Sequence, residues 1–107
     1  MLTINLQQYR TLGSKVFTGR DRGLDVRKRS KIDSMIASDE QVNVIIPDDI
    51  RSINPSFLEE FLFNVVSQLG ESGFNQKFKF ENLGRYKIDT DLKEAIERIL
   101  RKENALA

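Results

Sequence analysis

Apolar and polar positions alternate in some stretches of the chain and recur at helical spacing in others. Near the start, Leu2, Ile4 and Leu6 alternate with polar residues, which predicts a short strand with one apolar face. A second short strand is expected around residues 15–17, between two glycines. We expect these two strands to form a hairpin or a bent pair.

The next segment is highly charged, but its second half shows a helical period. Ile32, Met35 and Ile36 are spaced as residues on one face of a helix, which predicts a helix over about residues 23–37. Val26 fits this apolar face poorly. The first turn of the predicted helix is therefore less well defined than the rest.

The strongest strand signal and the strongest helix signal follow each other. Val42–Ile46 is β-branched and almost continuously apolar, which is typical of a central strand buried on both faces. Beyond it, Asn54 is a natural N-cap, Pro55 a natural first helical residue and Gly70 a natural stop. The apolar stripe of this helix consists of Phe57, Leu58, Phe61, Leu62, Val65, Val66 and Leu69.

Two further elements complete the pattern. Residues 74–82 read FNQKFKFEN, where Phe74, Phe78 and Phe80 predict an edge strand with one aromatic face. Residues 89–105 predict an amphipathic helix that begins with acidic residues and ends with basic ones.

The expected order of elements is β-β-α-β-α-β-α, in a single domain over residues 1–107. Strands that alternate with helices imply right-handed crossovers and mostly parallel pairing. We therefore predict an α/β fold with a mixed four-stranded sheet packed against about three helices. Three helices are enough to cover one face of the sheet more readily than both faces. Whether Val42–Ile46 is buried on both faces is therefore open.

The composition excludes several kinds of chemistry. The 107 residues include no cysteine and no histidine, so disulfides, histidine-dependent triads and metal sites built on either residue are excluded. The formal net charge of +1 points to no particular class of partner. No apolar run approaches the ~20 residues of a membrane span, and the first residues lack the pattern of a signal peptide. We expect a cytoplasmic protein without a cofactor.

The start of the predicted central helix is the first candidate site. Asn54-Pro55-Ser56 stands where a helix presents free amide donors and a partial positive charge. Open α/β sheets also place ligands beyond the carboxyl ends of their strands. Simple helix capping by Asn54 is the alternative.

A basic segment is the second candidate. Arg20, Arg22 and Arg27 lie in it together with Lys28, Arg29 and Lys31. Such a run can contact nucleic-acid phosphates or an acidic protein surface. It is also compatible with an ordinary solvated helix face.

Adjacent carboxylates form the third candidate. The pairs Asp48-Asp49 and Glu59-Glu60 carry the oxygen ligands that magnesium prefers. Adjacent acids are more often turn formers and solvated charges. We predict no metal site.

Three stretches, taken in order, resemble a known family. They are VFTGRDRGLDVRKR, VNVIIPDDIRSINPSFLEEFL and LGESGFNQKFKFENL. Together they resemble the STAS-like family of small bacterial and mobile-element proteins. The similarity covers about Phe17–Leu83, and its most specific motif is INPSFLEE over Ile53–Glu60.

The resemblance implies a sheet packed against helices and a function by protein docking. In the related anti-anti-sigma factors, a partner kinase phosphorylates a serine at this helix start. Pro55 stands at the position of that serine and cannot accept phosphate, whereas the neighbouring Ser56 carries a hydroxyl. The resemblance therefore implies a docking surface, with Ser56 as the candidate for phosphorylation and an ATP-binding kinase of the anti-sigma type as a candidate partner.

The sequence thus favours a non-enzymatic regulatory or adaptor domain that binds a protein partner. The alternative is an accessory protein that binds nucleic acid through residues 20–31. The predicted partner-binding residues are Ile53, Asn54, Pro55, Ser56, Glu59, Glu60, Arg20, Arg22 and Arg27.

Overall fold

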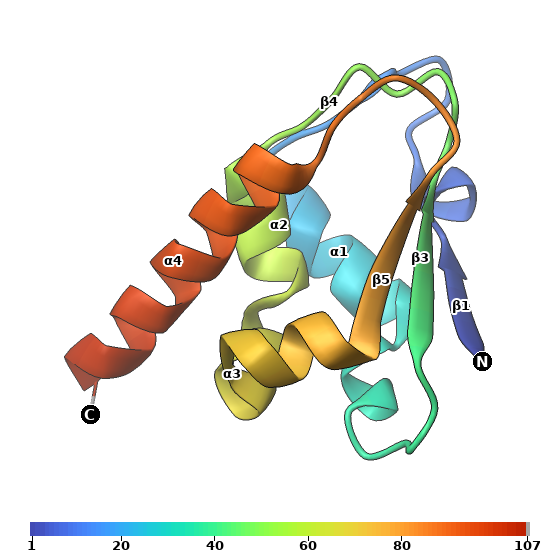
Figure 1. The fold of residues 1–107 in the computed structure, drawn as a ribbon. Coiled ribbons are helices and arrows are strands. Elements are labelled where there is room, and N and C mark those ends of the chain that lie inside the picture. The colour runs from blue at the N-terminus through green and yellow to red at the C-terminus, as the bar shows by residue number, and fades with distance from the viewer. Residues whose placement is uncertain (107) are drawn as a thin grey trace.

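Three parallel strands form the main sheet of the computed structural model, which describes residues 1–106, with side chains to residue 103. The strands are β1 (Leu2–Asn5), β3 (Val42–Ile46) and β5 (Phe78–Asn82), in the spatial order β1-β3-β5 (Figure 1). Ile4 lies opposite Val44, and Val44 lies opposite Phe80. These apolar residues share one face because side chains alternate along a strand.

Two shorter strands form a second parallel pair. β2 (Val16–Phe17) pairs with β4 (Ser52–Ile53). The backbone amide of Arg51 donates to the carbonyl of Lys15 at 2.7 Å, and the amide of Asn54 donates to the carbonyl of Phe17 at 2.8 Å. This pairing carries the chain from the main sheet to the start of the helix that follows β4.

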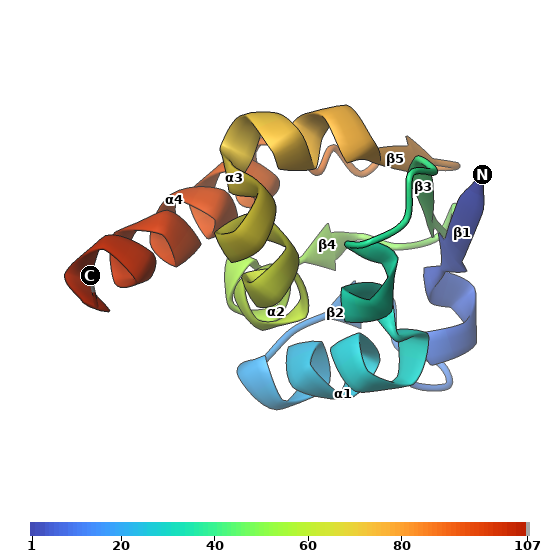
Figure 2. The ribbon, with the colours of Figure 1, turned by 90° about the horizontal axis from the view of Figure 1, so that it is seen from below.

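The described helices gather on one side of the main sheet (Figure 2). They are α1 (Arg20–Ser30), α2 (Pro55–Phe61), α3 (Phe63–Lys77) and α4 (Asp89–Leu106), with 3₁₀ turns η1 (Leu6–Tyr9) and η2 (Ile32–Met35). The later turns of α4 project beyond the other helices in both ribbon views. None of the described helices combines the length and the apolar character needed to cross a membrane.

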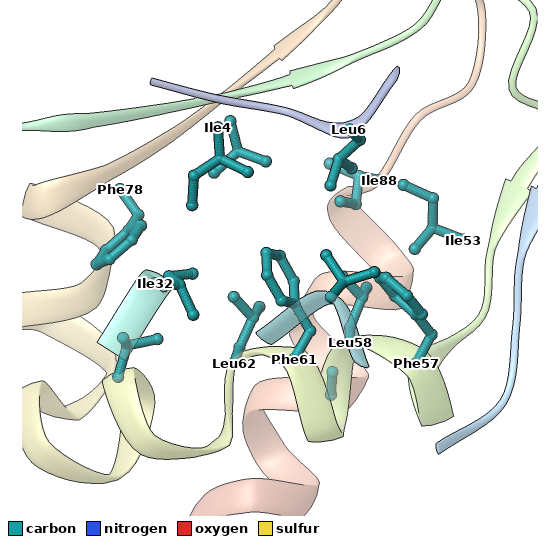
Figure 3. Packing of buried hydrophobic residues seen from close by; sticks show 14 of the residues in the cluster. Ile4, Leu6, Ile32, Ile53, Phe57, Leu58, Phe61, Leu62, Phe78 and Ile88 are labelled. Carbon is teal, nitrogen blue, oxygen red and sulfur yellow. The ribbon is translucent and has the colours of Figure 1, made fainter. Parts of the chain in front are cut away.

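One hydrophobic cluster fills the space between the sheet and the helices. In Figure 3, Ile4 and Phe78 from the sheet, Phe61 from α2 and Leu62 just after it point toward one another. The ring of Phe57 lies 5.1 Å from that of Phe17 and 5.7 Å from that of Phe61, within the range of favourable aromatic pairs. These contacts fix α2 against both sheets.

The predicted hairpin between the first two strands is wrong. β1 pairs in parallel with β3, whereas β2 pairs with β4. Residues after β1 enter η1 instead of a tight turn, so the chain moves away from β1 before β2 begins. The predicted four-stranded sheet is thus replaced by a sheet of three strands and a separate pair.

The predicted helix over residues 23–37 is two elements. α1 spans Arg20–Ser30, and Lys31 then adopts a left-handed conformation with φ of 57° before η2 begins. Val26, which fits the predicted face poorly, is fully buried. The reason is that α1 packs through a face with small residues, Gly23, Val26 and Ser30, which hydrophobic periodicity does not reveal.

The predicted central helix also differs in its extent. The helical run breaks at Leu62, where α2 ends and α3 begins. Gly70 interrupts helical geometry, with φ of 73°, but helical turns resume and continue to Lys77. Phe74, predicted in a strand, is therefore helical, and its ring stacks on Phe78 at 5.1 Å.

The central position of Val42–Ile46 is confirmed, but its burial is one-sided. Val42, Val44 and Ile46 are fully buried, whereas Asn43 and Ile45 on the opposite face are half-buried. The last helix follows its predicted range closely, beginning at Asp89.

Candidate partner-binding site

The start of α2 has the capping geometry that the sequence predicts. Asn54 Oδ1 accepts hydrogen bonds from the backbone amide of Ser56 at 2.9 Å and from its hydroxyl at 2.8 Å. Pro55 occupies the first helical position. Asn54 is exposed, and Pro55 and Ser56 are half-buried. The helix start therefore presents a capped but accessible corner of the surface.

Two of the predicted partner-binding residues have almost no accessible surface. Ile53 is part of the hydrophobic cluster, and Glu59 has a side chain that is 1% exposed. Glu59 Oε2 lies 2.9 Å from Arg20 Nη1, and Oε1 lies 2.7 Å from Lys102 Nζ. Both contacts are ion pairs. Ile53 and Glu59 are thus buried beneath the proposed contact surface and are not themselves accessible to a partner.

The basic segment is largely engaged with carboxylates of the same chain. Arg27 and Arg20 each lie 3.9 Å from an oxygen of Glu60. Arg22 contacts Asp25 at 3.1 Å and donates to the carbonyl of Tyr9 at 2.6 Å.

Arg29 follows the same pattern. It contacts Asp25 at 3.3 Å, and its guanidinium stands over the ring of Tyr9. The structure therefore brings the predicted residues Arg20, Arg27, Glu59 and Glu60 together as ion pairs between α1 and α2.

Sequence reasoning missed two hollows at the carboxyl edge of the main sheet. The larger, of about 650 Å³, is lined by residues 48–51 after β3 and residues 83–86 after β5. The smaller, of about 370 Å³, is lined by Gln7, Arg10, Leu12, Gly13, Lys15 and Asp49. The loops that form them run close together at the top of Figure 1. The carboxyl ends of parallel strands are the expected place for a site, but which loops meet there depends on strand order.

Close backbone contact holds two of these loops together. A Cβ atom at Gly84 would lie 2.1 Å from the carbonyl oxygen of Asp48, so only glycine permits this approach. The amide of Leu83 donates to the carbonyl of Ile46 at 3.1 Å. The loops after β3 and β5 therefore pack against each other and together line the larger hollow.

A two-pronged ion pair separates the two hollows. Arg10 Nη1 and Nη2 donate to Asp49 Oδ1 and Oδ2 at 2.7 and 3.0 Å, and Nη2 also donates to the carbonyl of Ser14. The hydrogen bond from Arg10 lowers the pKa of Asp49, and the same bond raises the pKa of Arg10. Both groups therefore remain charged around neutral pH.

Tyr86 connects the larger hollow to the start of α2 and to α4. Its hydroxyl donates to Asp91 Oδ2 at 2.6 Å and lies 3.1 Å from the carbonyl oxygen of Ile53. Burial, and secondly the bond to Asp91, raises the pKa of Tyr86 well above its ordinary value. The phenol is thus a neutral donor that fixes the loop before α4 against β4.

The carboxylate pairs do not assemble into a cation site. Asp49 faces Arg10, and Glu59 faces Arg20 and Lys102. Among the residues that the structure describes, no three acidic, histidine or cysteine side chains are grouped to hold a metal ion.

Comparison of the chain with models of protein families, with curated proteins and with solved structures found no match.

Proposed function

We propose that this chain is a non-enzymatic regulatory or adaptor module that binds a protein partner at the start of α2 and on the adjoining loops. The observation that carries the proposal is the accessible corner at Asn54 and Ser56, which stands beside loops held in place by Tyr86 and Gly84. A preorganised surface loses little conformational entropy on binding. Contacts made there need no movement of the core.

The resemblance to the STAS-like family supports the same interpretation and remains a prediction. It implies a sheet packed against helices and a docking site at this helix start. A cytoplasmic location and a kinase partner of the anti-sigma type belong to the same proposal. Of the predicted residues, we assign direct contact to Asn54, Pro55 and Ser56, and a supporting role to Ile53 and Glu59 because both are buried.

Phosphorylation of Ser56 would act directly on the proposed contact. The Ser56 hydroxyl donates to Asn54 Oδ1, and a phosphate would replace this donor with acceptor oxygens. The added negative charge would lie near the helix start, where the dipole favours it, so α2 would remain folded. The partner would meet a new charge and a larger group at the centre of its contact.

The test uses photo-crosslinking from the proposed contact. A photoreactive residue in place of Asn54 is expected to crosslink one discrete protein in native lysate, whereas the same residue in place of the exposed Ser72 on α3 is not. Ser56→Glu is expected to weaken that contact by tenfold or more, about 1.4 kcal/mol, while Ser72→Glu leaves it unchanged. Circular dichroism of each variant checks that the fold is kept. Equal crosslinking from both positions, or none from Asn54, would contradict the proposal.

Nucleic-acid binding through residues 20–31 is less well supported, because Arg20, Arg22, Arg27 and Arg29 face carboxylates of the same chain. It makes a different prediction. DNA or RNA would be retarded at low salt, and Arg27→Glu together with Arg29→Glu would abolish the retardation.

A further inference from the structure

The loops at the carboxyl edge of the main sheet expose apolar side chains. Four large hydrophobic residues are exposed in the described part of the chain, and three of them, Leu12, Val16 and Leu83, belong to these loops or to β2. Leu12 is fully exposed, and Leu83 is 56% exposed. Leu83 lines the larger hollow and Leu12 the smaller one. Exposed apolar side chains beside surface hollows are a common feature of interaction sites.

The charges around these apolar residues are mainly positive. Arg51 and Arg85 line the larger hollow, and Lys15 lines the smaller one. All three are exposed. Asp49 is neutralised by Arg10, which leaves Asp48 as the other carboxylate in the two linings. We call the set Leu12, Lys15, Arg51, Leu83 and Arg85 the edge surface.

We propose that the edge surface docks an acidic segment of a partner protein that carries apolar side chains. The apolar side chains would enter the hollows beside Leu83 and Leu12, and the carboxylates would pair with Arg51, Arg85 and Lys15. This inference rests on the proposed function and gives the chemistry of the partner. The edge surface adjoins the proposed contact, since Tyr86 lines the larger hollow and its hydroxyl lies beside the carbonyl of Ile53.

Other occupants fit the edge surface less well. A second copy of the chain related by a two-fold axis would bring like charges together, which opposes association. Single-stranded nucleic acid binds through aromatic stacking as well as charge, and the exposed apolar side chains here are leucines and a valine. An acidic and apolar protein segment complements both the charge and the apolar surface.

The test is a selection from displayed random peptides of all twenty residue types, with the wild-type chain as bait. The expected result is enrichment of peptides that combine Asp or Glu with Leu, Ile, Phe or Trp. The selected peptide is then synthesised, and its affinity is measured for wild type, for Arg51→Glu with Arg85→Glu, and for Lys28→Glu as a control on an exposed cation of α1. The double variant is expected to lose about tenfold or more in affinity, and the control to lose none.

Backbone NMR shifts locate the bound peptide. Shifts are expected at residues 10–16, 48–52 and 83–86. Leu83→Ser should also weaken binding at high salt, where the charge contribution is screened. Enrichment of neutral or basic peptides, absence of enrichment, shifts confined to another face, or an unchanged affinity of the double variant would each overturn the inference. Concentration-dependent dimerisation through these residues, or preferential binding of a single-stranded oligonucleotide there, would overturn it in favour of another occupant.

Failure of this inference is distinguishable from failure of the proposed function. A protein that crosslinks at Asn54 and is released by Ser56→Glu, but is insensitive to Arg51→Glu with Arg85→Glu, would preserve the proposed function and remove the edge surface from it. Loss of the Asn54 crosslink with retained acidic-peptide binding would preserve the edge surface as a docking site and remove the proposed contact at the start of α2.

Discussion

Asp49 lines both hollows, and a single arginine pairs with its carboxylate. Arg10 reaches it with both terminal nitrogens and also holds the carbonyl of Ser14, so one side chain joins three parts of the edge. Surface ion pairs usually contribute little to stability, but a two-pronged arginine–carboxylate contact fixes geometry as well as charge. We regard the pair mainly as a positioning device for the loops.

We expect Arg10→Gln to raise the pKa of Asp49 toward its ordinary value of 3.8. Because the folded pKa is depressed, the pair stabilises the fold above the ordinary pKa, and this contribution is lost as the pH falls through the folded pKa. Carbon-detected NMR titration of the carboxyl group measures the shift. Lys15→Gln is the matched control and should raise the pKa less, since Lys15 acts only through its charge. An unchanged titration in Arg10→Gln would show that the pair does not persist in solution.

The packing of α1 on α2 is the clearest case of a contact that hydrophobic periodicity conceals. A Cβ atom at Gly23 would lie 2.3 Å from the backbone carbonyl oxygen of Phe57, so the backbones of the two helices pack closely at this point. The sequence predicts a helix over 23–37 from Ile32, Met35 and Ile36, yet only the residues up to Ser30 form α1. A small residue at an interface leaves no apolar signal, whereas the cap at Asn54 is local and was predicted correctly.

Gly23→Ala is expected to lower the free energy of unfolding by about 1–3 kcal/mol, because the added methyl group forces the helices apart. Gly73→Ala on α3 is the matched control. Its Cβ would lie 3.3 Å from the Cβ of Leu69, a much milder contact than the one at Gly23, and alanine favours the helix by up to ~1 kcal/mol. Urea unfolding of both variants provides the comparison. A Gly23→Ala variant as stable as Gly73→Ala would contradict the close packing.

At the scale of the whole molecule, strand pairing joins segments that are distant along the chain. β1 pairs with β3 across α1, and β3 pairs with β5 across α2 and α3. The radius of gyration of 12.9 Å matches the ~13 Å expected for a compact chain of this length.

Alternation along a strand indicates which face of the strand is buried but not which strand lies beside it. For this reason the sequence predicted most elements but not the order of strands in the sheet. The edge surface escaped prediction for the same reason, since Arg51 and Leu83 line one hollow only through that order.

Ile4→Ala tests how strongly β1 belongs to the core. Ile4 is 2% exposed although β1 is an edge strand, so we expect a loss of about 2–5 kcal/mol in the free energy of unfolding. The neighbouring Thr3 is exposed on the other face, and Thr3→Ala should cost about 1 kcal/mol or less. Thermal and urea denaturation measure both. Similar small losses for the two variants would indicate that β1 is only loosely attached.

Glu59 receives its two cationic neighbours from opposite ends of the sequence, Arg20 of α1 and Lys102 of α4. Any shortened or fused version of the chain whose junction falls before Lys102 would leave this enclosed carboxylate with Arg20 but without the ion pair to Lys102. Those who design expression vectors or split reporters from this protein should therefore retain α4 through Lys102, and can best place a cut in an exposed loop away from this residue.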